Sequence, residues 1–251
     1  MYLSSRQLKA MSGLMQTLAE PYGEREIRAR VARQVLDLLD AQYFASYVWQ
    51  PGPGRFDQRI DLNMDPANLM RYECHFQFHD PITLKMQSHR RAVRATDVMP
   101  QADLMRTEFF NDFLARDGLH WGVNLYAWDG PSNIGDLRVW RDRRHGNFSD
   151  EDLKLLDLLR PALVTALRQA QTREPTAAPR RLAGPGGPPD PGAALSARER
   201  EVAELAALGL ADKEIARRLG LSPATVRTHL DHVFRKLGVD RRGKLAHCLR
   251  D

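Results

Sequence analysis

The first third of the chain contains a helical repeat of hydrophobic residues followed by segments typical of β-strands. Between residues 24 and 40, apolar side chains recur every three or four positions, which predicts an amphipathic helix. Residues 43–49 are aromatic and β-favouring, and the turn sequence PGPG at 51–54 leads toward a second strand near 56–62. The pattern therefore predicts a helix followed by a β-hairpin.

Helices and strands continue to alternate up to about residue 167. Further helices are expected at 65–75 and 103–116, and further strands at 92–98, 120–128 and 135–141. Ser149 and the three acids that follow it mark a helix start, because a serine oxygen and nearby negative charge both stabilise exposed N–H groups. The order of elements predicts an α+β domain around an antiparallel sheet.

A proline- and glycine-rich segment separates this region from the end of the chain. Residues 175–192 contain six prolines and four glycines, a density that excludes a helix or a central strand. We interpret the segment as a tether, because long structureless loops are uncommon inside compact domains. The predicted organisation is a domain at 1–172, a linker at 173–192 and a second domain at 193–251.

The second domain begins with clear helix signals. Ser196 and Glu199 have the spacing of a capping box, in which each side chain accepts a backbone N–H of the other residue. A short second helix ends at Gly220, which suits a left-handed cap, and Ser222 begins a third helix after a three-residue turn. Two short helices joined in this way predict a helix-turn-helix unit.

The third helix of this unit has two contrasting faces. Its apolar stripe, about 100° wide, consists of Val226, Leu230, Val233, Phe234 and Leu237. Its opposite face is small and polar with cations at the edges, and comprises Ala224, Thr225, Arg227, Thr228, Asp231, His232, Arg235 and Lys236. A helix of this kind can enter the major groove of DNA while its edge cations meet phosphates. The alternative is a helical protein-interaction module with a solvated polar face.

The charge distribution favours the first interpretation. The formal net charge is +5, of which residues 193–251 contribute +4 while residues 1–170 are neutral. A basic module attached to a neutral body indicates a polyanionic partner for that module.

Residues 195–237 closely resemble the C-terminal DNA-binding domain of LuxR-type bacterial transcription regulators, through EIARRL, SPATVRTH and KLGV at matching spacing. The resemblance implies a four-helix domain whose third helix lies in the major groove, with RRGKLAHCL as a fourth helix that contacts a second subunit. It also implies a homodimer on an inverted-repeat promoter site, with RNA polymerase as a further candidate partner. The matching DNA-contact positions are Arg227, Thr228 and Asp231, with Lys236 near the backbone.

Four more residues complete the expected DNA-binding set. Ser222 and Thr225 lie at the start of the third helix, where exposed N–H groups can bind a phosphate, and His229 and Arg235 lie along it. Asp231 departs from the family, which usually has Lys, Arg or Asn at this position. A carboxylate there can accept a hydrogen bond from a cytosine amino group, but phosphates repel it.

The first domain is rich in aromatic residues that suit the wall of a small-molecule pocket. Its element order, Asp80-Pro81, GLHWGVNLYAW at 118–128 and the helix at 148–163 resemble the autoinducer-binding, GAF/PAS-like domains of the same regulators. We therefore expect a small-molecule effector, held by Tyr43, Tyr47, Trp49, Tyr72, Asp80 and Trp121. Two tryptophans of the homoserine-lactone receptors are replaced near Asn68 and Ala95, so another small apolar or amphipathic metabolite is at least as favoured.

Other classes of function find little support in the sequence. No nucleophile motif, phosphate loop or acid–base pair has a recognisable spacing, so we expect no catalytic residues and no cofactor. His75 and His79 are four residues apart, but the flanking FQF favours a packed segment over a metal site. No apolar run is long enough to span a bilayer, and the two cysteines form no disulfide framework, so we expect a cytoplasmic protein.

Two alternatives remain for the first domain. It is either controlled by a protein partner without any small molecule, or it is an enzyme attached to a DNA-binding tail. A cleft with a strongly perturbed titratable cluster would indicate the enzyme.

Overall fold

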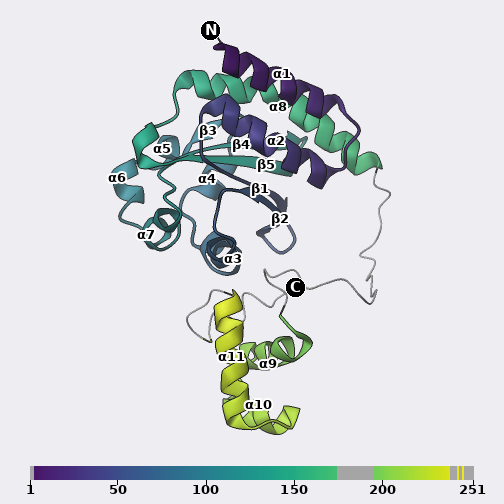
Figure 1. The fold of residues 1–251 in the computed structure, drawn as a ribbon, viewed down its shortest axis with the longest axis vertical. Coiled ribbons are helices and arrows are strands. Elements are labelled where there is room, and N and C mark those ends of the chain that lie inside the picture. Colours follow the sequence, from purple (N-terminus) through teal and green to yellow (C-terminus); the bar gives the residue numbers. More distant parts are fainter. Residues whose placement is uncertain (1–2, 174–194, 238–241, 243–244, 246–251) are drawn as a thin grey trace. The chain divides into compact units, whose positions relative to one another are not determined.

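The computed structural model describes residues 3–173, 195–237, 242 and 245 (Figure 1). The chain divides into two compact units. The first consists of Met1–Met64 and Asp80–Arg181, and the second of Asp65–His79 and Leu182–Asp251. The tether predicted at 173–192 lies outside the described residues except for Arg173.

A five-stranded antiparallel sheet forms the centre of the first unit. Its strands, in the spatial order β2-β1-β5-β4-β3, are β2 (Arg55–Leu62), β1 (Tyr43–Gln50), β5 (Ser132–Arg141), β4 (Trp121–Asp129) and β3 (Val93–Arg94). This confirms the α+β class and the antiparallel sheet predicted from the sequence.

Helices α2 (Glu24–Leu39) and α8 (Asp150–Arg173) cover one face of the sheet, and α1 (Ser5–Ala19) packs on these two helices (Figure 1). Their apolar stripes and one side of the strands share a single core, in which Val31, Leu125 and Leu163 are fully buried. The helix predicted at 24–40 is α2. Helix α1 was not predicted from the hydrophobic pattern, although Ser4 and Gln7 form a capping box at its start.

Shorter helices connect the strands: α4 (Thr83–Gln87), α5 (Ala95–Val98), α6 (Gln101–Leu104), α7 (Glu108–Asp112) and the 3₁₀ turn η2 (Leu114–Arg116). A further 3₁₀ turn, η3 (Arg143–His145), leads from β5 to α8. The prediction of a strand over 92–98 was wrong beyond Arg94, because the Asp97 carboxylate accepts the Arg94 N–H (3.0 Å) and starts a helical turn instead. The helix predicted at 103–116 is also interrupted, since the Thr107 hydroxyl accepts the Phe110 N–H and begins a separate helix.

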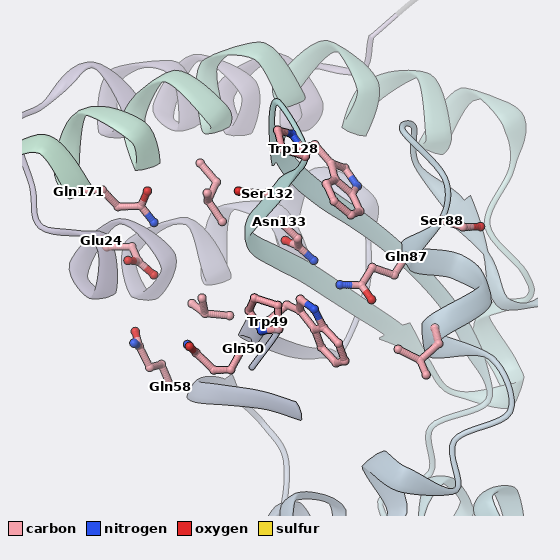
Figure 2. A pocket seen from close by; sticks show the side chains of 15 residues that line it. Glu24, Trp49, Gln50, Gln58, Gln87, Ser88, Trp128, Ser132, Asn133 and Gln171 are labelled. Atoms are coloured by element: carbon pink, nitrogen blue, oxygen red, sulfur yellow. The ribbon is translucent and has the colours of Figure 1, made fainter. Parts of the chain in front are cut away.

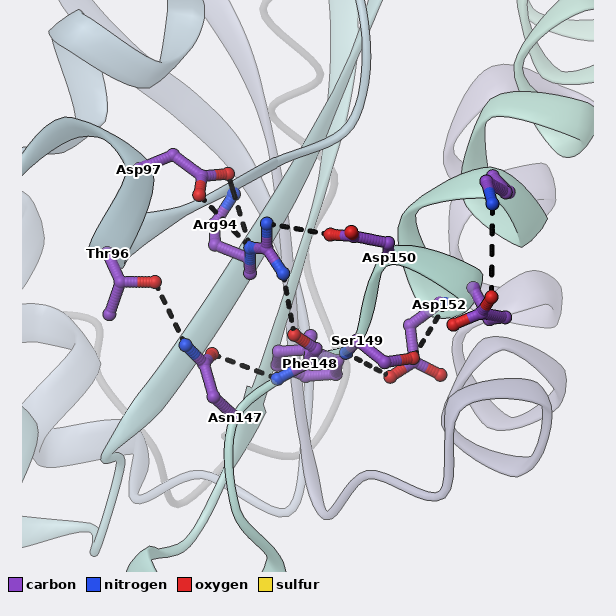
Figure 3. A network of polar contacts seen from close by, with 10 residues as sticks. Arg94, Thr96, Asp97, Asn147, Phe148, Ser149, Asp150 and Asp152 are labelled. Atoms are coloured by element: carbon purple, nitrogen blue, oxygen red, sulfur yellow. Dashed lines mark hydrogen bonds and ion pairs between the residues drawn. The ribbon is translucent and has the colours of Figure 1, made fainter.

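Hydrogen bonds fix the start of α8 (Figure 3). Ser149 Oγ accepts the Asp152 N–H (3.2 Å), and the Asp152 carboxylate accepts the Ser149 N–H (2.8 Å), which confirms the predicted helix start. Arg94 from β3 donates to the carbonyl of Phe148 (3.0 Å) and pairs with Asp150 (2.9 Å). The closing helix is therefore tied to the edge strand of the sheet.

The second unit contains α3 (Pro66–Cys74), η1 (Phe76–Phe78), α9 (Ala197–Ala207), α10 (Asp212–Leu219) and α11 (Pro223–Leu237). The predicted capping box of α9 is present, because Ser196 Oγ accepts the Glu199 N–H (3.2 Å) and Glu199 accepts the Ser196 N–H (2.7 Å). Arg242 donates to the Asp212 carboxylate at the start of α10 (2.6 Å). The predicted fourth helix falls almost entirely outside the described residues.

Gly122 provides a test of sheet packing. It lies opposite Trp140 on β4 and β5, and a Cβ at this position would come within 2.7 Å of the buried Trp140 ring. Gly122→Ala should therefore force the indole aside and lower the free energy of unfolding by about 1–2 kcal/mol, measured by urea denaturation.

Gly52→Ala is the matched control, since nothing lies within 4 Å of the added methyl group. It should change the free energy of unfolding by less than about 0.5 kcal/mol. Equal stability of the two variants would show that Trp140 does not pack on Gly122.

Candidate nucleic-acid interface and ligand cavity

The turn between α10 and α11 has the geometry that the sequence predicts. Gly220 adopts a left-handed conformation (φ 65°, ψ 36°), and nothing lies within 4 Å of the position that a Cβ would occupy. Ser222 Oγ accepts the Thr225 N–H (3.0 Å) and lies 2.8 Å from the Thr225 hydroxyl. The left-handed Gly220 thus ends α10, and the Ser222 cap begins α11 three residues after α10 ends.

Helix α11 buries one face and exposes the other. Val226, Leu230 and Val233 are buried in a small core with residues of α9 and α10. On the opposite face Ala224, Thr225, Arg227, Thr228, Asp231 and His232 are exposed, while His229 is half-buried. Arg235 and Lys236 belong to α11, but their side chains lie outside the described part of the chain.

The exposed face is suited to duplex DNA in shape and in charge. An α-helix fits the major groove, and the first two turns of α11 carry short side chains apart from Arg227 and His229. The Arg227 side chain is 78% exposed and only loosely paired with Asp212, at 3.9 Å. Exposed Arg217 and Arg218 add positive charge at the end of α10. Each copy of α11 can therefore place the Arg227 guanidinium at a base edge or a phosphate.

Five of the six predicted ligand residues belong to the first unit, where they lie in different surroundings. Tyr47 is buried beside Phe56 and under the Arg138 guanidinium, which lies 4.6 Å from the tyrosine ring. Tyr43 and Trp121 are half-buried, and burial raises the pKa of the Tyr43 hydroxyl. Tyr72 is buried on α3, which belongs to the other unit.

Asp80 and the Tyr47 backbone take part in polar contacts within the fold. Asp80 accepts the N–H groups of Ile82 and Thr83 (2.9 Å each), and desolvation raises the pKa of its carboxyl. The Tyr47 N–H donates to Asp136 (2.6 Å), which also pairs with Arg138 (2.7 Å). Burial raises the pKa of Asp136, and the Arg138 charge opposes that shift.

A cavity of about 680 Å³ opens at one end of the sheet (Figure 2). It is lined by parts of β1, β2, α4 and the β4–β5 hairpin, together with Glu24 of α2 and Gln171 of α8. Trp49 is the one predicted ligand residue among its lining residues. The volume is typical of sites for small organic molecules.

Three hydrogen-bond donors in this cavity have no partner among the described residues: Gln87 Nε2, Trp128 Nε1 and Asn133 Nδ2. Gln87 and Asn133 are each only 7% exposed. Figure 2 shows their side chains between the indoles of Trp128 and Trp49. Buried polar groups are nearly always hydrogen-bonded, so this group of three donors makes the cavity the candidate ligand site of the first unit.

Two irregularities in the sheet create this lining. Trp128 pairs with Asn133 and Ala127 with Gly135, so Ile134 is an extra residue that bulges from β5. A second shift in the β1–β2 register accompanies Gln58, a non-glycine residue with φ 56° that also lines the cavity. Bulges redirect side chains, and the regular alternation used for sequence prediction does not reveal them.

Comparison with known proteins finds a family match in the C-terminal part of the chain. Residues 193–249 match the model of bacterial regulatory proteins of the luxR family. The C-terminal helices form a LuxR-family DNA-binding domain. Over 57 residues the chain is 53% identical to the transcriptional regulatory protein UhpA of Salmonella typhimurium, a match that spans 23% of this chain and 29% of UhpA. The chain thus covers under a third of the first curated relatives it matches.

Two solved structures are similar in fold to a larger part of this chain. Escherichia coli SdiA superposes with a TM-score of 0.50 at 20% identity, over 96% of this chain and 95% of that one. CepR2 of Burkholderia cenocepacia, described as an N-acylhomoserine-lactone-dependent LuxR family transcription factor, gives a TM-score of 0.51 at 19% identity. That match covers 72% of this chain and all of CepR2. Within the described residues, no helix has the length and apolar character needed to cross a membrane.

Arg227→Ala tests the exposed face of the LuxR-family domain. Removing one cation that meets a phosphate should lower the affinity of the full chain for duplex DNA about fivefold to tenfold. It should also reduce the slope of log K against log salt by about 1. Fluorescence anisotropy at several salt concentrations measures both quantities, with Arg106→Ala, an exposed cation of the first unit, as control. If the two variants bind alike, Arg227 does not face the duplex.

Asp231→Lys tests the departure from the family pattern. Reversing the charge at this exposed position should tighten binding to non-specific duplex and steepen its salt dependence. Glu204→Lys makes the same charge change on an exposed position of α9, and it should have the smaller effect. An equal gain in both variants would assign the effect to net charge instead of to the position of Asp231.

Proposed function

We propose that the chain is a transcriptional regulator that binds duplex DNA through α11 as a homodimer and responds to a small molecule bound in its first unit. The observation that supports DNA binding most directly is that Val226, Leu230 and Val233 are buried on one face of α11 while the opposite face is exposed and polar. The neutral region 1–170 and the basic region 193–251 fit the same division of labour.

The cavity supports sensing over catalysis. Of the described residues that line it, Glu24 is the one ionisable side chain, and it lies 3.5 Å from the buried Arg28 guanidinium. General acid–base chemistry needs a titratable group positioned at the reacting atoms, often with a second group of opposite role. Amide and indole donors can bind and orient a molecule but do not move protons at neutral pH.

Regulation requires that the ligand prefer one arrangement of the DNA-binding domains. A ligand that binds two arrangements with equal affinity shifts nothing, however tightly it binds. Two copies of α11 in a symmetric dimer would lie about 34 Å apart on one face of the duplex, so the preferred site is an inverted repeat.

Selection from a random duplex library with the full chain tests this function. The enriched sequences should contain an inverted repeat with half-sites about 10 base pairs apart, bound with a strong salt dependence. Sedimentation of the complex should show two chains per duplex. Absence of salt-dependent binding to every duplex would contradict the proposal.

A further inference from the structure

We propose that the cavity at the end of the sheet binds an uncharged, planar molecule with two or more hydrogen-bond acceptors. The inference rests on the proposed sensing function and specifies its ligand class. It follows from three properties of the lining: the direction of its buried donors, its lack of a cation, and its pair of indoles.

The donor at Asn133 has a fixed direction. Asn133 Oδ1 accepts the Gly135 N–H at 3.0 Å, so the amide cannot turn over without losing that bond. Its Nδ2 is therefore held toward the cavity, where it has no partner among the described residues (Figure 2). Gln87 Nε2 and Trp128 Nε1 lie in the same lining and are likewise buried without a partner in the described part of the chain. An indole N–H can only donate, so a complementary ligand must present acceptors.

The charge of the lining excludes a strongly ionic ligand. No lysine, arginine or histidine is among the described residues that line the cavity, so a carboxylate or phosphate would lose its hydration without gaining a counterion. The Glu24 carboxylate is already close to Arg28 and therefore offers little to a cationic ligand. An uncharged molecule loses less hydration on entering the cavity and needs no counterion there.

The two indoles favour a flat ring system. The Arg90 guanidinium lies 4.4 Å from the centre of the Trp128 ring and donates to the Gly130 carbonyl (2.7 Å), which holds this indole in place. Trp49 packs against Phe56 with ring centres 4.8 Å apart. Both indoles are only partly buried and line the cavity, so each can offer ring surface to a planar partner.

Three groups of bicyclic probes test this assignment by ligand-observed NMR with the full chain. Caffeine and coumarin are neutral and planar, and each has at least two acceptor atoms. 1-Methylindole has a similar shape without a strong acceptor, and 2-naphthoate and theophylline-7-acetate are anions. We expect saturable binding of the first group, with dissociation constants at least tenfold lower than those of the other two groups.

Asn133→Asp is the sharpest variant for these titrations. It retains an oxygen for the Gly135 N–H but replaces the donor that faces the cavity with a second acceptor. Affinity for the neutral probes should fall at least tenfold. Gln171→Glu makes the same amide-to-acid change at an exposed lining residue on α8 and should alter affinity less than threefold.

Gln87→Met keeps the proposal testable if Asn133→Asp fails to fold. It removes a buried donor without adding charge, and it should weaken the neutral probes while the circular dichroism spectrum and the melting temperature are maintained. The assignment is overturned if no neutral probe binds, if 1-methylindole or the anions bind equally well, or if neither variant weakens binding.

Failure of the ligand assignment can be distinguished from failure of the proposed function. DNA affinity of the full chain is measured separately, with and without saturating caffeine or coumarin. Probe binding that is lost in Asn133→Asp supports the ligand class even where DNA affinity does not change, in which case the proposed coupling is wrong. Salt-dependent DNA binding with no probe binding in the cavity retains the DNA-binding function and rejects the ligand class.

Discussion

Buried hydrogen-bond donors need acceptors, and this requirement shapes several parts of the first unit. In the sheet, backbone N–H groups donate to carbonyls of neighbouring strands. At the start of α8, the side chains of Asp152 and Ser149 accept each other's backbone N–H. The Asp136 carboxylate accepts the Tyr47 N–H and pairs with Arg138. Three donors around one cavity do not meet this requirement within the described residues. Because an unsatisfied buried donor costs about 1–3 kcal/mol, their clustering is best explained by a partner from outside the chain.

The second unit meets a different constraint, which is to end one helix and begin another within three residues. Gly220 tolerates the left-handed backbone that ends α10, and Ser222 caps the exposed N–H groups that begin α11. The core of Val226, Leu230 and Val233 then fixes which side of α11 faces outward. The turn residues and the buried core thus determine which face of α11 is exposed, and the exposed side chains determine what this face binds.

The sequence predicted those features that depend on neighbouring residues. The caps at Ser149, Ser196 and Ser222 and the turn at Gly220 are all confirmed, because each depends on residues only a few positions apart. The strand at 92–98 was wrong because one local bond at Asp97 overrode its apolar pattern.

The cavity was not predictable in the same way. Aromatic content pointed to Trp49, but Gln87 and Asn133 are unremarkable in the sequence, and they line a common cavity only through a bulge and the packing of α4. A cluster of buried donors is a tertiary property that periodicity does not encode.

The side-chain N–H signals of the cavity test the central claim most directly. In ¹H–¹⁵N NMR spectra of the full chain titrated with coumarin, the signals of Gln87 Nε2, Asn133 Nδ2 and Trp128 Nε1 should move together along one saturation curve. The Trp121 Nε1 signal should stay in place, since Trp121 does not line the cavity. Movement of Trp121 alone, or of none of the three cavity donors, would contradict the account.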